Sequence, residues 1–542
     1  MEASSHVAKK GGQTHSVFLT FVSTVLSLRG NSVVSQPLED TDSESLLCWN
    51  GEAWTIRNQE IDGNDAQVLF HQLIKAASAA QSDQALQNIL GVFDGVTGPF
   101  SFVFYDAYHH YVFFGRDVLG RRSLMVNNTL PEMIAVSSIA DVQDRQSWAE
   151  VGLGQVYMVD LRKALNSDAE ASQRIKSFSW SLENPEIELH HTLHYPFPKF
   201  NSNIEAEASS PLSFESDAVR NLSEKLSNSL RLRLRLESIP CPPLNTPDPV
   251  CTAILFSGGL DCAVLARIAH EVLPKTRDID LLNVAFENPR VIREAASDCS
   301  SLTSSAYAVC PDRITGLSTY KEILRLCHGR TWRFVAVDVP YSELKAHRDQ
   351  IISLIYPHNT EMDFSIACAL YFAARGTGRV LDTSGASTHS YSTPARILLS
   401  GLGADELFGG YTRHASAFNR GGYAGLADEL QLDFYRLGKR NLGRDDRVIA
   451  HWGREVRYPY LDEELVRWAL SVPAWEKCGF GQKNTPEDNS SPRLEPGKKV
   501  LRLLAWKLGL HGAAAEKKRA IQFGARTAKM EGGKTKGTAI LT

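Results

Sequence analysis

The sequence predicts a two-domain α/β protein, with an N-terminal α+β sandwich followed by a doubly wound parallel sheet. The chain has 542 residues, more than one core of about 100–200 residues usually needs. The first 160 residues contain short strands and turn signals, whereas the second half alternates continuous apolar runs with amphipathic segments. A polar, Pro- and Ser-containing stretch separates the two patterns. We therefore expect domains at residues 1–165 and 216–542, joined by a linker at 166–215.

Three local patterns define the N-terminal domain. Asn50-Gly51 stands between two apolar runs and predicts a type I′ hairpin, because both turn positions need positive φ. Apolar residues spaced near 3.6 predict a helix around 68–74. Residues 100–105 and 111–114 predict two strands joined by a short turn. This succession of strands with one helix is typical of an α+β sandwich.

Residues 17–26 follow two lysines and could be taken for a secretory leader. Hydroxyl residues interrupt the apolar run, and no small-x-small cleavage pattern follows it. A buried strand is the better interpretation of this segment.

The C-terminal domain carries the pattern of a parallel sheet covered on both faces. Continuous apolar strands separated by amphipathic helices are typical of doubly wound proteins, whose ligands bind beyond the carboxyl ends of the strands. The predicted strands are 251–256, 281–286, 334–337 and 397–399, and the predicted helices include 262–273, 341–355 and 363–376. Polar residues at 381–395 and 480–497 predict surface loops.

Composition excludes several classes of function. Hydrophobic residues make up 43% and charged residues 22%, with a net charge of −4, so no global charge favours nucleic acid or an anionic membrane. Arg231, Arg233 and Arg235 follow a helix that starts near 216, and we interpret them as solvated. Nine scattered cysteines suit a reducing compartment, and no apolar run reaches the roughly 20 residues of a membrane span. A soluble cytoplasmic protein without nucleic-acid or membrane partners is expected.

The first predicted parallel strand ends in a loop suited to phosphate. Ser257-Gly258-Gly259-Leu260-Asp261-Cys262 leads directly into a helix, so backbone N–H groups and the helix N-terminus can form an anion cradle. No Lys follows the glycines, so this is not a Walker A loop. Asp261 would repel phosphate directly and therefore implies a bridging cation, most simply Mg²⁺. The alternative is an ordinary strand-to-helix turn in which Asp261 caps the helix.

A second strand ends in a similar loop with adjacent acids, Ser400-Gly401-Leu402-Gly403-Ala404-Asp405-Glu406. If the two strands are close in the sheet, Asp261 and Asp405 can share one Mg²⁺ with phosphate oxygens. The alternative is that Asp405 and Glu406 are solvated acids at a helix start.

This motif pair resembles that of asparagine synthetases and their pyrophosphate-loop relatives. Residues 400–411 read Ser-Gly-x-Gly-x-Asp-Glu-x-Phe-Gly-Gly-Tyr, and residues 457–462 are similar to the family's R-x-P-[FY]-L-D segment. Asn50-Gly51-Glu52 and the Gly-Arg-Asp-x-x-Gly-Arg-Arg-Ser-Leu run at 115–124 resemble a class II glutamine amidotransferase. The resemblance spans residues 17–530 and looks closest to the asparagine synthetase domain-containing branch. It implies an Ntn-hydrolase type of N-terminal domain.

The resemblance implies an ATP-dependent amidoligase, in which ATP and aspartate give β-aspartyl-AMP and ammonia from glutamine then displaces AMP. The implied partners are ATP, Mg²⁺, an aspartate-like acid and glutamine or ammonia, and a homodimer is compatible with it. Asp261 and Asp405 would hold Mg²⁺, and Lys518 or Arg519 would stabilise charge at the α-phosphate. The implied ATP- and pyrophosphate-binding residues are Leu255, Ser257, Gly258, Gly259, Asp261, Cys262, Val284, Ser400 and Gly401. The implied glutamine-binding residues are Asn50, Gly51, Glu52 and Asp65.

The sequence departs from this pattern at two places. Class II amidotransferases use an N-terminal cysteine whose own α-amine is the base, but this chain begins Met1-Glu2-Ala3 and its first cysteine is Cys48. The glutaminase half is therefore expected to be inactive as written, either because the start is missing or because the domain is a retained shell. Leu402 stands where the synthetases carry Glu, and an apolar side chain accepts no proton.

Three functions remain open from the sequence. The first is the amidoligase, and the second is a non-catalytic nucleotide-binding or interaction protein on the same scaffold, which Leu402 and the absent cysteine favour. The third is an enzyme that adenylates another substrate such as a tRNA base, which the composition does not favour.

Overall fold

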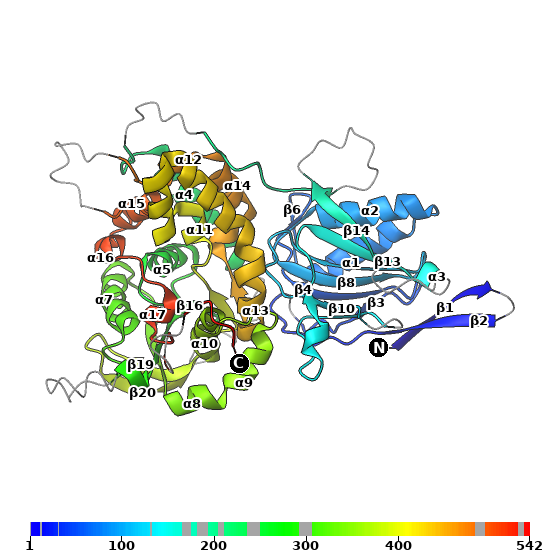
Figure 1. The fold of residues 1–542 in the computed structure, drawn as a ribbon, viewed down its shortest axis with the longest axis horizontal. Coiled ribbons are helices and arrows are strands. Elements are labelled where there is room, and N and C mark those ends of the chain that lie inside the picture. The colour runs from blue at the N-terminus through cyan, green and yellow to red at the C-terminus, as the bar shows by residue number, and fades with distance from the viewer. Residues whose placement is uncertain are drawn as a thin grey trace. The chain divides into compact units, whose positions relative to one another are not determined.

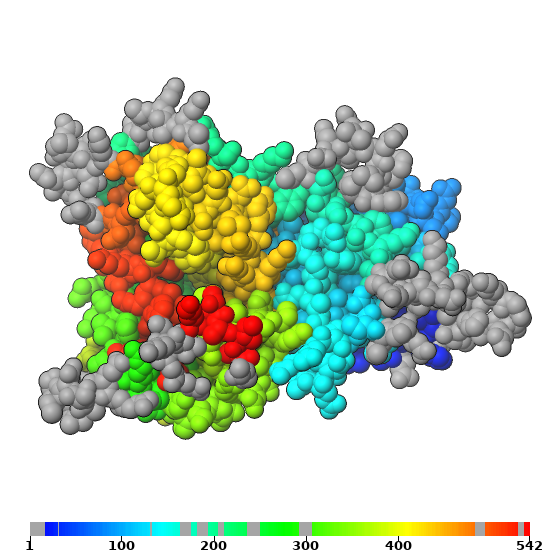
Figure 2. All heavy atoms as spheres, in the orientation of Figure 1, coloured from blue at the N-terminus to red at the C-terminus, as the bar shows by residue number. Residues whose placement is uncertain are grey.

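The computed structural model describes most of the chain (Figures 1 and 2). The described residues are 2–10, 13–30, 32–129, 133–164, 175–181, 193–203, 211–235, 250–291, 306–482, 494–528, 530 and 536–541. They divide into two compact units. The first contains the chain up to Pro196 and a later segment, Gly438–Arg447, and the second contains most of the remainder. Over the described ranges, none of the helices combines the length and the apolar character that a membrane crossing requires.

The first unit is built on a seven-stranded sheet of order β15-β14-β13-β9-β8-β4-β3, in which only β14 and β15 pair in parallel. Its strands are β3 (Leu38–Glu39), β4 (Leu46–Gly51), β8 (Phe100–Asp106), β9 (Tyr111–Arg116), β13 (Gln155–Asp160), β14 (Ile175–Ser181) and β15 (Leu193–His194). Smaller sheets are formed by β1 (Glu2–Lys10) with β2 (Gln13–Thr20), by β5 (Thr55–Ile56), β6 (Gln59–Glu60) and β7 (Val96–Thr97), and by β10 (Met125–Asn127), β11 (Ala135–Ser137) and β12 (Ala149–Glu150).

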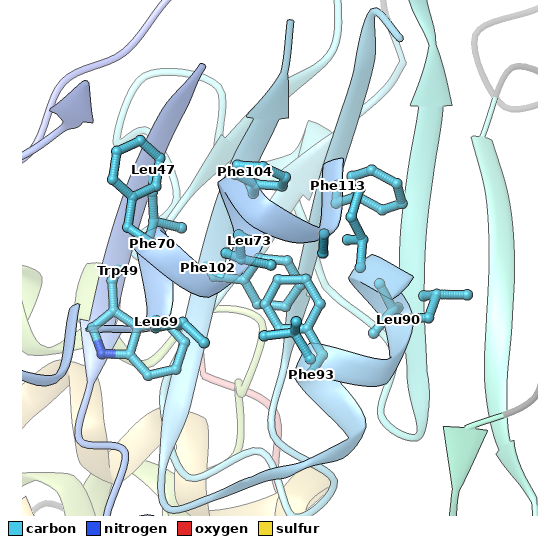
Figure 3. Packing of buried hydrophobic residues seen from close by; sticks show 14 of the residues in the cluster. Leu47, Trp49, Leu69, Phe70, Leu73, Leu90, Phe93, Phe102, Phe104 and Phe113 are labelled. Atoms are coloured by element: carbon cyan, nitrogen blue, oxygen red, sulfur yellow. The ribbon is translucent and has the colours of Figure 1, made fainter. Parts of the chain in front are cut away.

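Alternation of side chains along the strands divides the core of this unit between the two faces of the sheet. Trp49, Phe102 and Phe104 point toward α1 (Asp65–Ala77) and α2 (Ser82–Asp94), where they pack with helix residues such as Leu69 and Phe93 (Figure 3). Neighbouring strand residues point to the other face and form a second cluster with residues of β10 and β11. The sequence did not predict α2.

The Asn50-Gly51 hairpin prediction is wrong. Both residues belong to β4, where Asn50 pairs with Ser101 and Gly51 with Phe100. A Cβ on Gly51 would lie 2.2 Å from the Pro99 carbonyl oxygen, so the glycine permits close approach of two backbones. Close strand approach, not a turn, explains this glycine.

Two other N-terminal predictions differ from the structure. The segment interpreted as a linker contributes β14 and β15 to the main sheet, and Trp180 of β14 packs on the helix-side core. Residues 17–26 are a strand only as far as Thr20, and Phe18 is 81% exposed, so the run is not the buried strand expected. Polar composition hid these strands because no residue of β14 is fully buried.

The second unit contains the predicted parallel sheet, with order β20-β19-β18-β17-β16-β21-β22. Five strands are parallel, and β19 and β20 form an antiparallel edge. Every residue of β17 is buried, which requires cover on both faces of the sheet. The strands are β16 (Thr252–Leu255), β17 (Ile279–Phe286), β18 (Trp332–Val339), β19 (Thr377–Leu381), β20 (Ser387–Ser392), β21 (Ile397–Leu399) and β22 (Glu455–Arg457).

The helices of this unit follow the predicted amphipathic segments. Predicted helix 341–355 is interrupted at His347, and the other predicted helices agree within a few residues. The principal helices are α4 (Asp217–Arg233), α5 (Leu260–Val272), α7 (Pro311–Leu326), α8 (Tyr341–Ala346), α9 (Arg348–Ile355), α10 (Glu361–Arg375), α11 (Ala404–Phe408), α12 (Thr412–Leu437), α14 (Glu463–Ser471), α15 (Lys499–Lys507), α16 (His511–Ala515) and α17 (Ile521–Gly524); α13 (Gly443–Ala450) passes from one unit to the other.

Three features of the second unit differ from what the sequence predicts. The polar stretch 381–395 includes strand β20, which sits at the sheet edge and is mostly exposed, so its polarity reflects an edge strand. Arg233 is buried and donates to Asp462 at 2.7 Å, so it is not solvated. Cys251 is disulfide-bonded, which differs from the reducing compartment that the scattered cysteines suggest. Much of the loop predicted at 480–497 lies outside the described residues.

Candidate functional site

The two motif loops lie at the switch point of the parallel sheet. From β16 the chain continues outward through β17 and β18 on one side, whereas β21 and β22 lie on the other side. β16 and β21 are paired in parallel, so the loops after Leu255 and Leu399 both leave the sheet at the carboxyl-terminal end of the strands. This position is where doubly wound sheets bind ligands.

Glycines allow the two loops to approach their neighbours closely. Gly258 has a φ of +82°, and a Cβ there would lie 2.5 Å from the Cα of Gly316 in α7. A Cβ on Gly401 would lie 2.9 Å from the Cβ of Asp261. The loop of β16 is therefore held between α7 on one side and the loop of β21 on the other.

Asp261 and Asp405 converge on one ammonium group, that of Lys498. The Lys498 Nζ lies 2.7 Å from Asp261 Oδ2 and 2.6 Å from Asp405 Oδ1. Asp261 is in the first turn of α5, Asp405 is in α11, and Lys498 immediately precedes α15. Lys498 is only 3% exposed. Three segments more than 90 residues apart in sequence thus form one buried charge cluster.

Lys518 completes this cluster from the C-terminal side. Its ammonium donates to Asp405 Oδ2, so Asp405 contacts two lysines. Burial opposes ionisation of Asp405, but the two ammonium groups outweigh it and hold the pKa of the carboxyl well below its usual range. Burial lowers the pKa of Lys518, whereas the negative charges of Asp405 and Asp261 raise it. The net effect is an increase in the pKa of Lys518. Asp405 and Lys518 are therefore both charged at neutral pH.

Glu406, next to Asp405, is in a different state. It is buried, and Tyr411 donates its hydroxyl to Glu406 Oε1 at 2.6 Å. Burial and the adjacent Asp405 charge raise the pKa of Glu406 to about 7. One acid of the pair is thus firmly ionised while the other holds its proton more readily.

A separate acid, Asp312, lies on the α7 side of the cluster. It is 7% exposed, and the Arg519 Nη1 is 3.8 Å from its Oδ1. Arg519 also donates to Thr315 Oγ1 at 3.3 Å, so α7 positions this arginine beside Lys518. Burial raises the pKa of Asp312 to about 7, although the Arg519 charge opposes the increase.

Asp312→Asn is expected to remove a pH dependence of stability. Because the folded-state pKa of Asp312 is raised from 3.8 to about 7, the folded state binds more protons than the unfolded state between these values. The free energy of unfolding then falls as pH rises from 4 to 7. Urea unfolding at pH 5 and pH 8 should show a smaller decline for Asp312→Asn, with a gain of about 1–2 kcal/mol at pH 8. An unchanged pH profile would contradict the burial argument.

The carboxylate pair fits a divalent cation held together with phosphate. In the described chain, no group of three or more His, Cys, Asp and Glu residues is arranged as a metal site. Mg²⁺ commonly uses only one or two carboxylates plus phosphate and water oxygens. The Lys498 ammonium contacts both carboxylates, so the two acids already share one positive charge.

The other residues predicted to bind the nucleotide lie in the two loops or in the strands that precede or adjoin them. Ser257 Oγ accepts from Gly259 N at 3.3 Å, and Ser400 Oγ accepts from Leu402 N at the same distance. Leu255 ends β16, and Val284 lies in the adjacent β17. Burial raises the pKa of Cys262 to about 11, so its thiol is a packing group. The structure places these residues on adjacent strands and on the loops at the carboxyl-terminal end of those strands.

Two of the predicted glutamine-binding residues, Glu52 and Asp65, belong to a polar cluster with Arg29 in the first unit. Asp65 Oδ2 accepts from Trp49 Nε1 at 3.1 Å and Ala53 N at 2.8 Å, and its burial raises its pKa. Arg29 lies 3.7 Å from Glu52 and donates to the Ala53 and Ile61 carbonyls. Asn50 and Gly51 end β4, and the Asn50 side chain is exposed. Burial raises the pKa of Cys48 to about 11, which leaves no thiolate there at neutral pH.

Sequence reasoning missed three residues of these clusters. Lys498 follows Pro496-Gly497 at the end of a polar stretch, and Asp312 starts an ordinary-looking helix. Arg29-Gly30 gave a local signal, because the arginine follows an apolar run and precedes a turn glycine at a φ of +81°. Lys498 and Asp312 can be recognised as site residues only when the fold brings distant segments of the chain together.

Comparisons with known proteins agree with the motif pair. Residues 419–505 match the family model described as asparagine synthase. The chain is 34% identical to asparagine synthetase domain-containing protein 1 of Bos taurus, over 94% of this chain and 89% of that protein. It is 33% identical to an asparagine synthetase domain-containing protein of Saccharomyces cerevisiae, over 96% of this chain and 86% of that protein.

More distant similarity reaches a named synthetase. Asparagine synthetase [glutamine-hydrolyzing] of Sandersonia aurantiaca is 23% identical, over 81% of this chain and 68% of that protein. A Bacillus subtilis PRPP amidotransferase structure aligns with 48% of the chain at 15% identity and a TM-score of 0.20, which is too weak to assign a fold. The sheet and its sequence motifs define an asparagine synthase-type protein. Within that class, the chain belongs to the asparagine synthetase domain-containing proteins.

Proposed function

We propose that this protein is an ATP-dependent amidoligase that activates a carboxylate as an acyl-adenylate and transfers ammonia to it. The observation that supports this most is the convergence of Asp261 and Asp405 on Lys498 at the switch point of the sheet. Buried opposite charges that can rearrange around a polyphosphate suit nucleotide chemistry better than a purely structural role.

In the proposed first step, a carboxylate oxygen of an aspartate-like acid attacks the α-phosphorus of ATP. The bond between the α-phosphorus and the bridging oxygen breaks, and pyrophosphate leaves with that electron pair. Asp261 and Asp405 would hold Mg²⁺, which supplies charge neutralisation at the leaving pyrophosphate. Lys498 and Lys518 would orient the phosphates and stabilise the charge that develops on them.

In the proposed second step, ammonia attacks the acyl carbon, and AMP leaves as the amide forms. The nitrogen must lose a proton, and Leu402 offers no acceptor for it. The amide-forming step therefore depends on another group or on solvent. Glutamine as the nitrogen source would involve the Arg29, Glu52 and Asp65 cluster of the first unit.

Pyrophosphate release tests the proposal directly. Purified protein is incubated with Mg²⁺-ATP, aspartate and ammonia, and its rate is compared with those of Asp261→Asn and of Asp428→Asn, whose side chain is exposed on α12. We expect Asp261→Asn to lose about a hundredfold in rate and Asp428→Asn to match the wild type. Equal release by wild type and Asp261→Asn would refute adenylation at this site.

Leu402 favours a second candidate, a nucleotide-binding protein that does not form the amide. This alternative predicts ATP binding that depends on Asp261, without asparagine production from aspartate and ammonia. Chromatographic detection of asparagine in the same reaction decides between the two proposals.

A further inference from the structure

A cavity of about 360 Å³ lies in the second unit between α8, α9 and α10 and the C-terminal segment. This volume is at the lower end of the range for small-molecule sites. None of its lining residues belongs to the two motif loops or to the lysines that contact Asp261 and Asp405. The lining consists of Tyr341, Leu344, Lys345, Arg348, Glu361, Met362, Phe364, Ser365, Gln522, Phe523, Thr527, Ala528, Met530 and Gly537.

The walls of this cavity are held together by backbone hydrogen bonds. Glu361 N donates to Ala539 O and Met362 N donates to Gly537 O, both at 2.9 Å, so the C-terminal residues satisfy the first turn of α10. In Figure 2 the red C-terminal residues lie directly against the yellow-green part of the chain. The α17 helix, which also contributes lining residues, packs against α10. The cavity is therefore bounded by helices and by a C-terminal segment that is hydrogen-bonded to α10.

Among the residues that the structure describes, the charged side chains that line this mainly apolar cavity form no ion pairs with one another. The Arg348 guanidinium lies 5.6 Å from the centre of the Phe364 ring, and the Lys345 ammonium lies 5.9 Å from that of Tyr341. Within the described ranges, neither cation has a carboxylate within 4 Å, and Glu361 has no cation within that distance. By contrast, the nearby Arg375 is paired with Glu343.

Opposite charges that line one apolar cavity but do not meet suit a ligand that carries both charges. A half-buried arginine binds a carboxylate well, and a carboxylate binds an ammonium group. Aromatic and aliphatic side chains such as Phe364, Leu344 and Met530 would bury an apolar group attached beside the two charges. A simple fatty acid carries no cation and would leave the Glu361 carboxylate without a partner.

We propose that this cavity binds a small zwitterion with an apolar side chain, which is the chemistry of a hydrophobic amino acid. Arg348 contacts the carboxylate, with Lys345 nearer the solvent, and Glu361 contacts the ammonium. This inference does not depend on adenylation at the motif loops, because the two sites share no residue.

Isothermal titration of the full chain tests this proposal with four probes: L-leucine, L-methionine, L-phenylalanine and L-tryptophan. We expect at least one to bind, and Arg348→Gln and Glu361→Gln each to weaken that binding about tenfold or more. The matched controls are Arg231→Gln and Glu224→Gln, which alter exposed side chains on α4. Unchanged melting temperatures show that the variants remain folded.

Analogues of the phenylalanine probe separate the two charged contacts. Glu361→Gln should not weaken 3-phenylpropionate, which has no amine, and Arg348→Gln should not weaken 2-phenylethylamine, which has no carboxylate. The proposal is overturned if none of the four amino acids binds, if both variants bind them as the wild type does, or if 3-phenylpropionate binds the wild type more tightly than L-phenylalanine does.

Discussion

Asp405→Asn should slow pyrophosphate release about a hundredfold or more and also lower the free energy of unfolding. Asp405 contacts two ammonium groups, and the amide leaves Lys518 without its carboxylate partner. Removing one member of a buried ion pair costs about 3–5 kcal/mol. Lys498 keeps Asp261 and Lys518 is 30% exposed, so we expect a smaller loss, about 2 kcal/mol, in urea unfolding at pH 7.

The same substitution removes one of the two carboxylates proposed to hold Mg²⁺, so the rate should fall about a hundredfold or more. The control, Asp428→Asn, should change neither the stability nor the rate. Retained pyrophosphate release in a destabilised Asp405→Asn protein would show that the cluster is structural. An unchanged free energy of unfolding would instead show that the lysines relax into solvent.

The sequence predicted the parallel sheet because its strands are buried on both faces and read as continuous apolar runs. The β17 strand is the clearest example, since all eight of its residues are buried. Strands covered on one face or placed at an edge carry a weaker signal. The partly exposed β14 and the edge strand β20 therefore resemble a linker and a loop in sequence, and the short β22 gives no strand signal.

The motif loops could be recognised because their spacing is local, whereas their charge partners could not. Asp261 and Asp405 belong to compact sequence patterns, but Lys498 and Asp312 acquire their meaning only from packing against those loops and Arg519. The Asn50-Gly51 turn shows the opposite error. There a strong local signal was overridden because β8 pairs along the whole of β4.

Lys498→Met should separate cation binding from catalysis. The Lys498 ammonium lies within 2.7 Å of both aspartates and occupies the position between them. Its removal leaves two carboxylates facing each other, a pair that repels unless a cation binds or one acid takes up a proton. Binding of Mn²⁺ without nucleotide, measured by electron paramagnetic resonance, should therefore become tighter, by about tenfold.

Pyrophosphate release by Lys498→Met should nevertheless fall about a hundredfold, because an ammonium group that would stabilise the phosphate charge is gone. The control Lys321→Met removes an exposed lysine from α7 and should leave both measurements unchanged. Opposite changes in Mn²⁺ affinity and rate are not expected of general destabilisation, which would weaken both. If Mn²⁺ binding also weakens, Lys498 serves mainly to hold the two loops together, and the two aspartates do not form a cation site of their own.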